Sequence, residues 1–336
     1  MSKKTLLSGV KPTGRPHIGN YFGAMKQFVG LQDEYHALYM IADYHALNFI
    51  QDKKELSQNI LDLMLDYLAI GLDPKKSLIF KQSDVSEHTE LAWIFDAITT
   101  MPYLMRAHAY KDAEAKNKEI NVGTFNYPML MAADILLYDT DVVPVGADQK
   151  QHVEYARDTA EKFNRIFKND VFKLPDAKII QEVSVVPGTD GQKMSKSYNN
   201  TIPLFAEDEE IKKAVMSIVT DSEKAEESMV MEQLSTQRKP LVFHRPANVY
   251  QIHRLFRSES ELAALYQQNQ GKYQAVKEAL IEDIKTFITP LREKRKHLAD
   301  DTDFVLDVLK EGGERAKLIA EKKMEMVRET IGVKLY

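Results

Sequence analysis

Apolar and polar positions in the first half of the chain follow two alternating patterns. Short apolar runs rich in β-branched and aromatic residues predict buried strands at residues 5–9, 36–43 and 77–82. Apolar positions with helical spacing follow at residues 53–70 and 85–100. Strands that alternate with helices form a parallel sheet of the doubly wound kind, which binds ligands at the carboxyl ends of its strands. We therefore expect an α/β fold with a doubly wound parallel sheet.

The alternation is interrupted at residues 101–127. The charged stretch at residues 111–118 contains few large apolar side chains, so we expect a mobile loop there, within an insertion of about residues 101–140. A helix that begins at the Asp cap of residue 148 is expected to run to residue 164. This helix would return the chain to the parallel-sheet fold.

The strand signal fades from about residue 202. Helical patterns fill the rest of the chain, at residues 208–218, 247–257, 259–267, 274–289 and 303–327. A chain of 336 residues holds about two domains. We therefore predict a doubly wound domain at residues 1–200 and an all-helical domain at residues 201–336.

Composition excludes several classes of protein. Cysteine is absent, so the chain has no disulfide scaffold, thiolate metal site or cysteine nucleophile. No long uncharged apolar run is present, and Met1 to Lys4 lead directly into the first strand, so we expect a cytoplasmic protein. The net charge of -5 argues against a generic nucleic-acid-binding protein, although local basic patches could still bind nucleic acid.

The turn after the first expected strand has the features of a phosphate site. Gly14 and Pro16 mark the turn, and a helical pattern starts at Gly19. A helix N-terminus offers free backbone N–H groups and partial positive charge to phosphate. His17 and Asn20 add side-chain donors. An ordinary strand-to-helix turn explains this stretch equally well.

A second candidate phosphate site is the sequence KMSKS at residues 193–197, which we call the lysine loop. Its two lysines stand three residues apart and follow a Gly-rich and Pro-rich turn at residues 187–191. Such a loop can bend over a triphosphate and place both ammonium groups on it. The alternative is a solvated loop without a ligand.

Asp134 is the most informative residue for substrate choice. It is the one carboxylate within residues 129–138, where every other residue is apolar or aromatic. An ionised carboxylate buried without a partner costs several kcal/mol, so we expect Asp134 to have one. From the residues alone, that partner is a nearby Arg or backbone N–H.

Together, the lysine loop and residues 16–20 resemble the signature pair of the class I aminoacyl-tRNA synthetases. Their first motif reads His-Ile-Gly-His in most members, and Asn20 at its fourth position is similar to the tryptophan branch of that class. Residues 127–138 and 143–152 also resemble the tryptophanyl-tRNA synthetases, with spacing largely preserved over residues 7–200. The resemblance implies a Rossmann-like catalytic domain.

The resemblance also implies a site for ATP. Gly146 and Asp148 stand where the family contacts the ribose, Met194 would pack near adenine, and Mg²⁺ would arrive with ATP without its own protein ligands. The implied ATP-binding residues are Lys11, Pro12, Thr13, His17, Gly19, Asn20, Gly146, Ala147, Asp148, Val186, Lys193, Met194, Ser195, Lys196 and Ser197. Catalysis by alignment and charge neutralisation would fall to Lys193, Lys196, Asn20 and Lys11.

Tryptophan has an implied site of its own around Asp134. By the resemblance, the carboxylate accepts the indole N–H, which can only donate. Tyr127 and Met131, seven and three residues earlier on the same helical face, would contact the amino group and the ring. Val143 and Val145 would line the apolar slot, and Gln149 would reach the α-groups of the amino acid. His45 and His152 are interpreted as structural histidines.

Two departures from the family pattern concern the ATP side. Lys11 stands where many bacterial relatives carry Gln, and Leu7 stands where they carry Phe, so Lys11 could add a phosphate-binding charge. The segment at residues 184–192 differs in length from those relatives, which leaves the register of the adenine contact at Val186 open.

The implied reaction is attack of the tryptophan carboxylate on the α-phosphorus of ATP, followed by transfer to the terminal ribose of tRNA. The resemblance further implies a homodimer whose helical C-terminal domain recognises the anticodon. We expect the basic residues between Arg292 and Lys323 to contribute to that recognition, in particular the run Arg292, Lys294, Arg295 and Lys296.

Three alternatives stay open. A tyrosyl-tRNA synthetase shares the fold and the lysine loop, but its substrate hydroxyl normally requires a Tyr and Asp pair. A small-molecule nucleotidyltransferase rarely needs a long helical region after KMSKS. A non-enzymatic paralogue typically loses the signature residues, which are nearly intact here.

Overall fold

The computed structural model describes residues 3–115, 119–146, 150–179, 186–219 and 247–336. The chain divides into two compact units. The first consists of residues 1–15, 27–181 and 297–336, and the second of residues 16–26 and 182–296. No helix in the described part of the chain is long and apolar enough to cross a membrane.

The described part of the first unit contains a parallel sheet. Its strands are β1 (Thr5–Val10), β2 (His36–Ile41), β3 (Leu78–Lys81), β4 (Val142–Val145) and β5 (Asp176–Ile179). They lie in the order β3-β2-β1-β4-β5, and every neighbouring pair is parallel. The chain moves outward from β1 to β3 and then crosses to the other side of β1 at β4. This reversal confirms the doubly wound parallel sheet.

Helices surround the sheet and fill the second unit. In the first unit or at its boundary lie α2 (Lys26–Glu34), α3 (Asp43–Ala46), α4 (Lys53–Ile70), α5 (Glu87–Ile98), α6 (Met101–Leu104), α7 (His108–Ala115), α8 (Val122–Leu136), α9 (Lys150–Phe167) and α14 (Thr302–Thr330). The second unit contains α1 (Ile18–Asn20), a π-helical turn (Tyr21–Met25), α10 (Asp208–Met216), α11 (Ala247–His253), α12 (Glu259–Gln268) and most of α13 (Tyr273–Asp300). The helical C-terminal region is thereby confirmed.

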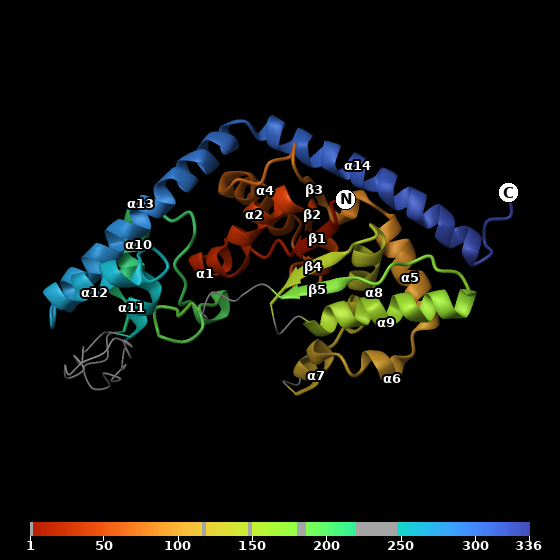
Figure 1. The fold of residues 1–336 in the computed structure, drawn as a ribbon, viewed down its shortest axis with the longest axis horizontal. Helices are drawn as coiled ribbons and strands as arrows, with labels where there is room; N and C mark the ends of the chain where they lie inside the picture. The colour runs from red at the N-terminus through yellow and green to blue at the C-terminus, as the bar shows by residue number, and fades with distance from the viewer. Residues whose placement is uncertain (1–2, 116–118, 147–149, 180–185, 220–246) are drawn as a thin grey trace, which may run out of the picture. The chain divides into compact units, whose positions relative to one another are not determined.

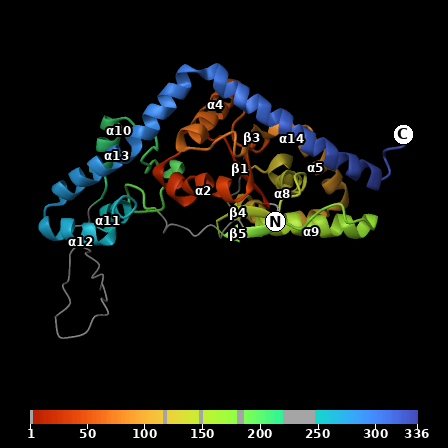
Figure 2. The ribbon, with the colours of Figure 1, turned by 45° about the horizontal axis from the view of Figure 1, so that its top comes forward.

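Strands β1 to β3 are mostly buried on both faces of the sheet, which explains their nearly continuous apolar runs. On one face, Leu38 and Phe80 belong to a core that includes residues of α5, α8, α9 and α14. On the other face, the ring of Tyr39 packs against Phe28 of α2 and Tyr67 of α4. Figures 1 and 2 show α4 and α8 on opposite sides of the strands.

The ends of α4 follow from its sequence. The Asp52 side chain accepts a hydrogen bond from the backbone N–H of Glu55 and caps the first turn. Gly71 ends the helix with a φ of 108°, a left-handed conformation that side chains other than glycine rarely adopt. The predicted helix at residues 53–70 is confirmed.

The loop expected at residues 111–118 is wrong for its first five residues. Residues 108–115 form α7, whose sequence HAYKDAEA contains three alanines, the residue with the highest helix propensity. Residues 116–118 lie outside the described part of the chain. The exposed charges of Lys111 and Glu114 therefore belong to a helix and not to a loop.

The long helix α14 packs on the sheet of the first unit and lies beside β3 and α5 (Figure 1). A Cβ atom at Gly312 would lie 1.7 Å from the backbone oxygen of Ile79, so glycine permits this close approach. Lys323 Nζ donates to the backbone oxygen of Val171 at 3.0 Å, and the Arg328 guanidinium forms two hydrogen bonds to Glu90. These contacts attach α14 to β3, to the segment after α9 and to α5.

Candidate functional site

The carboxyl ends of the strands bring polar residues to one edge of the sheet. Lys11, Pro12 and Thr13 directly follow β1, and His45 lies in α3 directly after β2. Gln82 follows β3. Gly146 follows β4, while Ala147, Asp148 and Gln149 lie outside the described residues. This edge is where doubly wound sheets bind their ligands.

Asp134 on α8 is joined to that edge by a buried network. Its side chain is 2 % exposed. Oδ2 lies 2.9 Å from His45 Nε2, and Oδ1 accepts a 2.7 Å hydrogen bond from Gln82 Nε2. His88 Nδ1 lies 2.7 Å from Oδ1. The partner expected from the sequence, an Arg or backbone N–H, is wrong, because histidines and an amide take that place.

These partners decide the charge of Asp134. Burial by itself raises the pKa of the carboxyl, but the hydrogen bond from His45 and the neighbouring His88 outweigh that effect and hold the pKa at about 2. The carboxylate is therefore ionised inside an apolar core. His88 is fixed in turn, because its Nε2 lies 2.8 Å from the hydroxyl of Tyr138.

Tyr127, expected in the amino-acid site, lies beside His45, which contacts this carboxylate. The ring of Tyr127 meets the ring of His45 edge-on at 6.5 Å, and its hydroxyl lies 2.6 Å from His152 Nε2. Val143 belongs to the apolar core that includes the neighbours of Asp134 on α8, and the partly buried Met131 and Val145 pack against that core. His152, interpreted as a structural residue, thus supports the hydroxyl of Tyr127.

Lys11 lies beside an aromatic ring. Its Nζ is 4.7 Å from the ring centroid of Phe49, within the range of a cation–π contact. Desolvation lowers the pKa of this lysine. The backbone of Thr13 donates to the oxygen of Lys11, which closes the turn after β1.

The second unit brings the two halves of the signature together. The backbone of Ile18 donates to Ile202, and Leu204 donates to Pro16, so residues 16–18 are paired with the segment that follows the lysine loop. His17 and Asn20 form a reciprocal cap, in which His17 Nδ1 accepts from the backbone N–H of Asn20 at 3.2 Å and Asn20 Oδ1 accepts from that of His17 at 3.1 Å. Gly19 lies between these two residues.

The reciprocal cap defines which donors His17 and Asn20 present. Because Nδ1 accepts a hydrogen bond, the neutral His17 ring carries its proton on Nε2. Burial, followed by the positive charge of Lys196, lowers the pKa of His17 to about 4, so the ring is neutral near pH 7. His17 and Asn20 therefore retain one donor group each, Nε2–H and the Nδ2 amide.

The lysine loop begins on the second arm of a hairpin. The backbone of Met194 donates to Val186, and that of Gly188 donates to Gln192, around the turn expected at residues 187–191. Met194 is buried, whereas Lys193 and Lys196 are exposed. Ser195 Oγ lies 2.9 Å from Ser197 Oγ across the following 3₁₀ turn (Lys196–Tyr198). Backbone pairing therefore holds the loop while its two lysines face solvent.

The basic run on α13 has a structural role in part. Arg292 is buried and donates to the backbone oxygen of Ala206 at 2.7 Å and to Asp208 at 2.9 Å. Lys296 pairs with Glu207, and the guanidinium of Arg295 lies 5.4 Å from the ring of Phe205. These three residues attach residues 205–208 to α13, so the run is not a simple solvent-facing patch.

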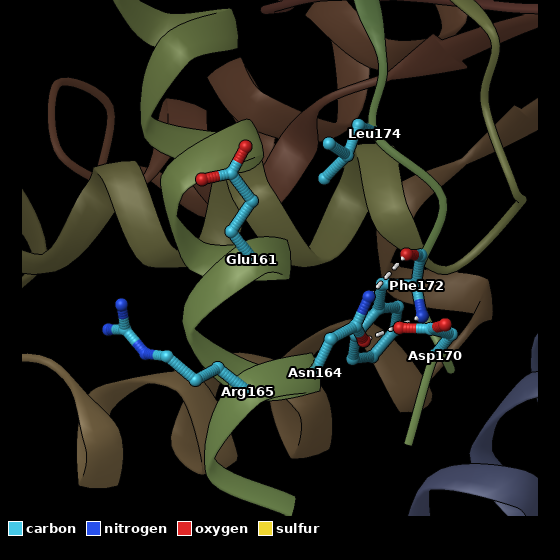
Figure 3. A pocket seen from close by; sticks show the side chains of 6 residues that line it. All are labelled: Glu161, Asn164, Arg165, Asp170, Phe172 and Leu174. Atoms are coloured by element: carbon cyan, nitrogen blue, oxygen red, sulfur yellow. Dashed lines mark hydrogen bonds between the residues drawn. The ribbon is translucent and has the colours of Figure 1, made fainter. Parts of the chain in front are cut away.

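A surface pocket of about 440 Å³ lies away from these residues. It is lined by Glu161, Asn164, Arg165, Asp170, Phe172 and Leu174 (Figure 3). Within the lining, Asn164 Nδ2 donates to the backbone oxygen of Phe172, and Asn164 Oδ1 accepts from the backbone N–H of Phe172. None of the expected site residues lines this pocket.

Comparison with known proteins assigns the family. The model of the family described as tRNA synthetases class I (W and Y) matches residues 2–289. The chain belongs to this family.

Relatives of this class I synthetase match over nearly their full length. A tryptophan–tRNA ligase of Fusobacterium nucleatum is 48% identical over 98% of this chain and 98% of its own. One of Rhodopirellula baltica is 44% identical over 98% and 99%. The crystal structure of tryptophanyl-tRNA synthetase from Campylobacter jejuni complexed with ADP and tryptophan is 42% identical, with a TM-score of 0.84 over 98% and 99% of the chains.

Sequence reasoning missed several residues of this synthetase's network. Gln82 and His88 contact Asp134 but lie in a 3₁₀ turn and in α5, where the sequence predicts only the end of a strand and a helix. His45, interpreted as a structural histidine, forms a hydrogen bond to Asp134. A signal for all three was available, since Gln82 is the last residue of an expected strand and His45 and His88 follow the ends of expected strands.

Proposed function

We propose that this class I synthetase is a tryptophan–tRNA ligase. It activates L-tryptophan with ATP to give tryptophanyl-adenylate and pyrophosphate, and then transfers tryptophan to the 3′ terminal ribose of its tRNA. The observation that carries the proposal is the ionised Asp134 carboxylate within an apolar core, in a chain that shares 48% of its residues with a tryptophan–tRNA ligase.

The contacts of Asp134 leave room for the indole N–H. A carboxylate oxygen accepts two hydrogen bonds. Oδ1 meets Gln82 and His88, whereas Oδ2 meets only His45 among the described residues. We assign the remaining acceptor position on Oδ2 to the substrate. A phenylalanine ring has no N–H donor and would leave this acceptor position of Asp134 without a hydrogen bond. The site should therefore favour tryptophan over phenylalanine.

The rest of the tryptophan site follows the family pattern. Tyr127 would contact the amino group, Met131 the ring, and Val143 and Val145 the apolar slot. Gln149 would reach the α-groups, although it lies outside the described residues. The hydrogen bond between Tyr127 and His152 supports this assignment, since it holds the tyrosine ring next to His45.

ATP would bind with Mg²⁺ through residues of both signature halves. Lys193 and Lys196 neutralise phosphate charge, and the retained donors of His17 and Asn20 contact phosphate oxygens. Lys11, Pro12 and Thr13 act from the turn after β1, with Gly146, Ala147 and Asp148 on the ribose side and Val186 and Met194 near adenine. Ser195 and Ser197 complete the loop. Both lysines are exposed, so a ligand in solvent can reach them, which supports this assignment.

A cytoplasmic homodimer that binds tRNA completes the proposal. Catalysis by residues 1–200 and anticodon recognition by residues 201–336 stay predictions. Because Arg292, Arg295 and Lys296 support local structure, we assign tRNA contacts to other basic side chains between residues 292 and 323, such as the exposed Lys294. Lys294→Glu should weaken tRNA charging in a salt-dependent manner and leave adenylation intact.

Amino-acid-dependent pyrophosphate exchange tests the function. The purified full chain is supplied with ATP, Mg²⁺ and each of the 20 amino acids in turn. We expect rapid exchange with tryptophan alone. Equal or faster exchange with tyrosine would move the assignment to a tyrosine–tRNA ligase, and no exchange with any amino acid would reject the proposed activity.

A further inference from the structure

Asn200 lies three residues after the lysine loop, and its side chain is almost fully enclosed, at 1 % exposure. Its Oδ1 accepts a hydrogen bond from the backbone N–H of Ser195 at 2.7 Å. Its Nδ2 donates to Asp190 Oδ1 at 2.7 Å and to the backbone oxygen of Lys193 at 3.2 Å. One amide therefore joins the turn before the lysine loop to two backbone groups within it.

The packing around this amide is close. A Cβ atom at Gly188 would lie 2.2 Å from Asn200 Nδ2, so the hairpin arm runs directly against the side chain. The backbone oxygen of Asn200 also accepts from the N–H of Thr189 at 2.9 Å. Both the side chain and the backbone of Asn200 thus contact residues 188–190, whereas only its side chain forms the two hydrogen bonds to Lys193 and Ser195.

The held groups are those that set the direction of the two lysines. The oxygen of Lys193 and the N–H of Ser195 flank Met194, whose side chain is buried. Lys196 begins the 3₁₀ turn immediately afterwards. Fixing the backbone on both sides of Met194 therefore fixes where Lys193 and Lys196 leave the backbone, while their long side chains stay in solvent.

We propose that Asn200 is a positioning residue that holds the lysine loop in the conformation in which Lys193 and Lys196 meet the phosphates of ATP. The inference rests on the proposed tryptophan activation for its kinetic consequence. A neutral amide suits this role, because it supplies both a donor and an acceptor without altering the charge seen by phosphate. Loss of these bonds leaves Ser195 N–H without the partner it now has and removes one donor from Asp190 Oδ1, which also accepts from the backbone N–H of Gln192.

The kinetic test compares the full-length parent with Asn200→Ala in tryptophan-dependent pyrophosphate exchange at varied ATP. We expect kcat/KM for ATP to fall roughly 10- to 100-fold, as for the loss of buried hydrogen bonds of about 1–3 kcal/mol. Tryptophan affinity measured without ATP should stay within about twofold, because no substrate contact is removed. Asn199→Gly is the matched control, since it removes the adjacent exposed amide at a left-handed position that glycine accepts.

A charge swap separates positioning from general folding. Asn200→Asp places a carboxylate against Asp190 and should lower ATP kinetics at least as far as Asn200→Ala. Adding Asp190→Asn restores one donor and one acceptor across the same contact, while the bond to Lys193 stays lost. We expect partial recovery in the double variant. A double variant no better than Asn200→Asp alone would overturn the assigned contact.

Hydrogen exchange gives a readout that does not depend on the activity. Segment 193–200 of the parent should exchange more slowly than that of Asn200→Ala, with the largest change at the amide of Ser195. Parent protein inactive with every amino acid would reject the proposed function and leave this comparison intact. Unchanged exchange at Ser195, unchanged ATP kinetics, or an equal loss of tryptophan affinity would each overturn the positioning role.

Discussion

Asp134 and the lysines of the lysine loop carry their charges in opposite surroundings. The carboxylate is buried and has His45, Gln82 and His88 as neighbours. The two lysines are exposed, and a buried neutral residue, Asn200, holds only the backbone from which they extend. The difference follows from the groups that each region is proposed to meet.

Selection of an uncharged ring requires a hydrogen bond that water does not replace, so the acceptor must be desolvated and kept ionised by fixed donors. Neutralisation of a triphosphate requires positive charges on flexible side chains that can stay with the phosphates as they move during the reaction. The lysines therefore extend into solvent and stay hydrated. We therefore expect changes at Asp134 to alter the choice of amino acid and changes in the loop to alter ATP chemistry.

The largest expected effect is that of Asp134→Asn on tryptophan selection. An amide cannot accept from His45, Gln82, His88 and an indole N–H with the strength of a carboxylate, so kcat/KM for tryptophan should fall by ~2 to 4 kcal/mol in transition-state terms. Steady-state exchange at varied tryptophan measures it, and Asp307→Asn on the exposed face of α14 is the control. A folded variant with an unchanged specificity constant would return Asp134 to a purely structural role.

The next effect concerns the lysine loop. Lys196→Ala should slow adenylation and raise its activation free energy by ~2 to 3 kcal/mol, because a positive charge near the phosphates is lost. Tryptophan affinity without ATP should be nearly unchanged. Single-turnover adenylation and equilibrium binding measure the two quantities, with the exposed Lys212→Ala as control. An equal loss in both would show that the loop is a structural support and would remove the contrast with Asp134.

The same comparison shows how far sequence reasoning extends. The strands β1 to β3 and the helix α4 are predictable, because these strands are apolar and mostly buried and the signals for the ends of α4, Asp52 and Gly71, are local. Asp134 stands out because a carboxylate in an apolar run needs a partner. Its actual partners depend on the packing of α8 against segments 46 to 89 residues away in the chain, which periodicity does not encode. The role of Asn200 could not be predicted for a different reason: it follows the KMSKS motif and does not differ in sequence from an ordinary polar loop residue.

A smaller effect is expected at Asp96, which tests the role of the donors around Asp134. Asp96 lies on α5, and its Oδ2 accepts from Asn126 on α8, whereas its buried Oδ1 has no hydrogen-bond partner among the described residues. Burial raises the pKa of Asp96 to about 6, and the single hydrogen bond only partly opposes it. Burial with too few donors thus moves a carboxyl in the opposite direction from Asp134.

The sign of the stability change follows from that pKa. The unfolded carboxyl titrates near pH ~4, so between about pH 4 and 6 the folded state binds more protons and stability falls as pH rises. Asp96→Asn should therefore stabilise the protein by about 1 kcal/mol above pH 6, discounted for partial exposure, and by nearly nothing below pH 4. Urea unfolding at both pH values measures this difference. A variant equally stabilised at both, or destabilised above pH 6, contradicts the prediction.

The smallest expected effect is on the pKa of His17, and it tests whether the lysine loop acts on the first signature half at all. Burial lowers this pKa most, and Lys196 lowers it further, to about 4. Because the folded pKa lies below the unfolded value of ~6.5, the stability from neutral His17 is complete above about pH 6.5 and is lost as pH falls toward 4.

Lys196→Ala should raise the pKa of His17 toward its ordinary value. Lys193→Ala, which removes the same charge from a position that does not contribute to the shift, should leave it unchanged. NMR titration of the His17 ring in the three proteins measures both effects. Equal shifts in the two variants would show that His17 responds to net charge alone, and no shift in either would place Lys196 too far from His17 for the two signature halves to share one phosphate site.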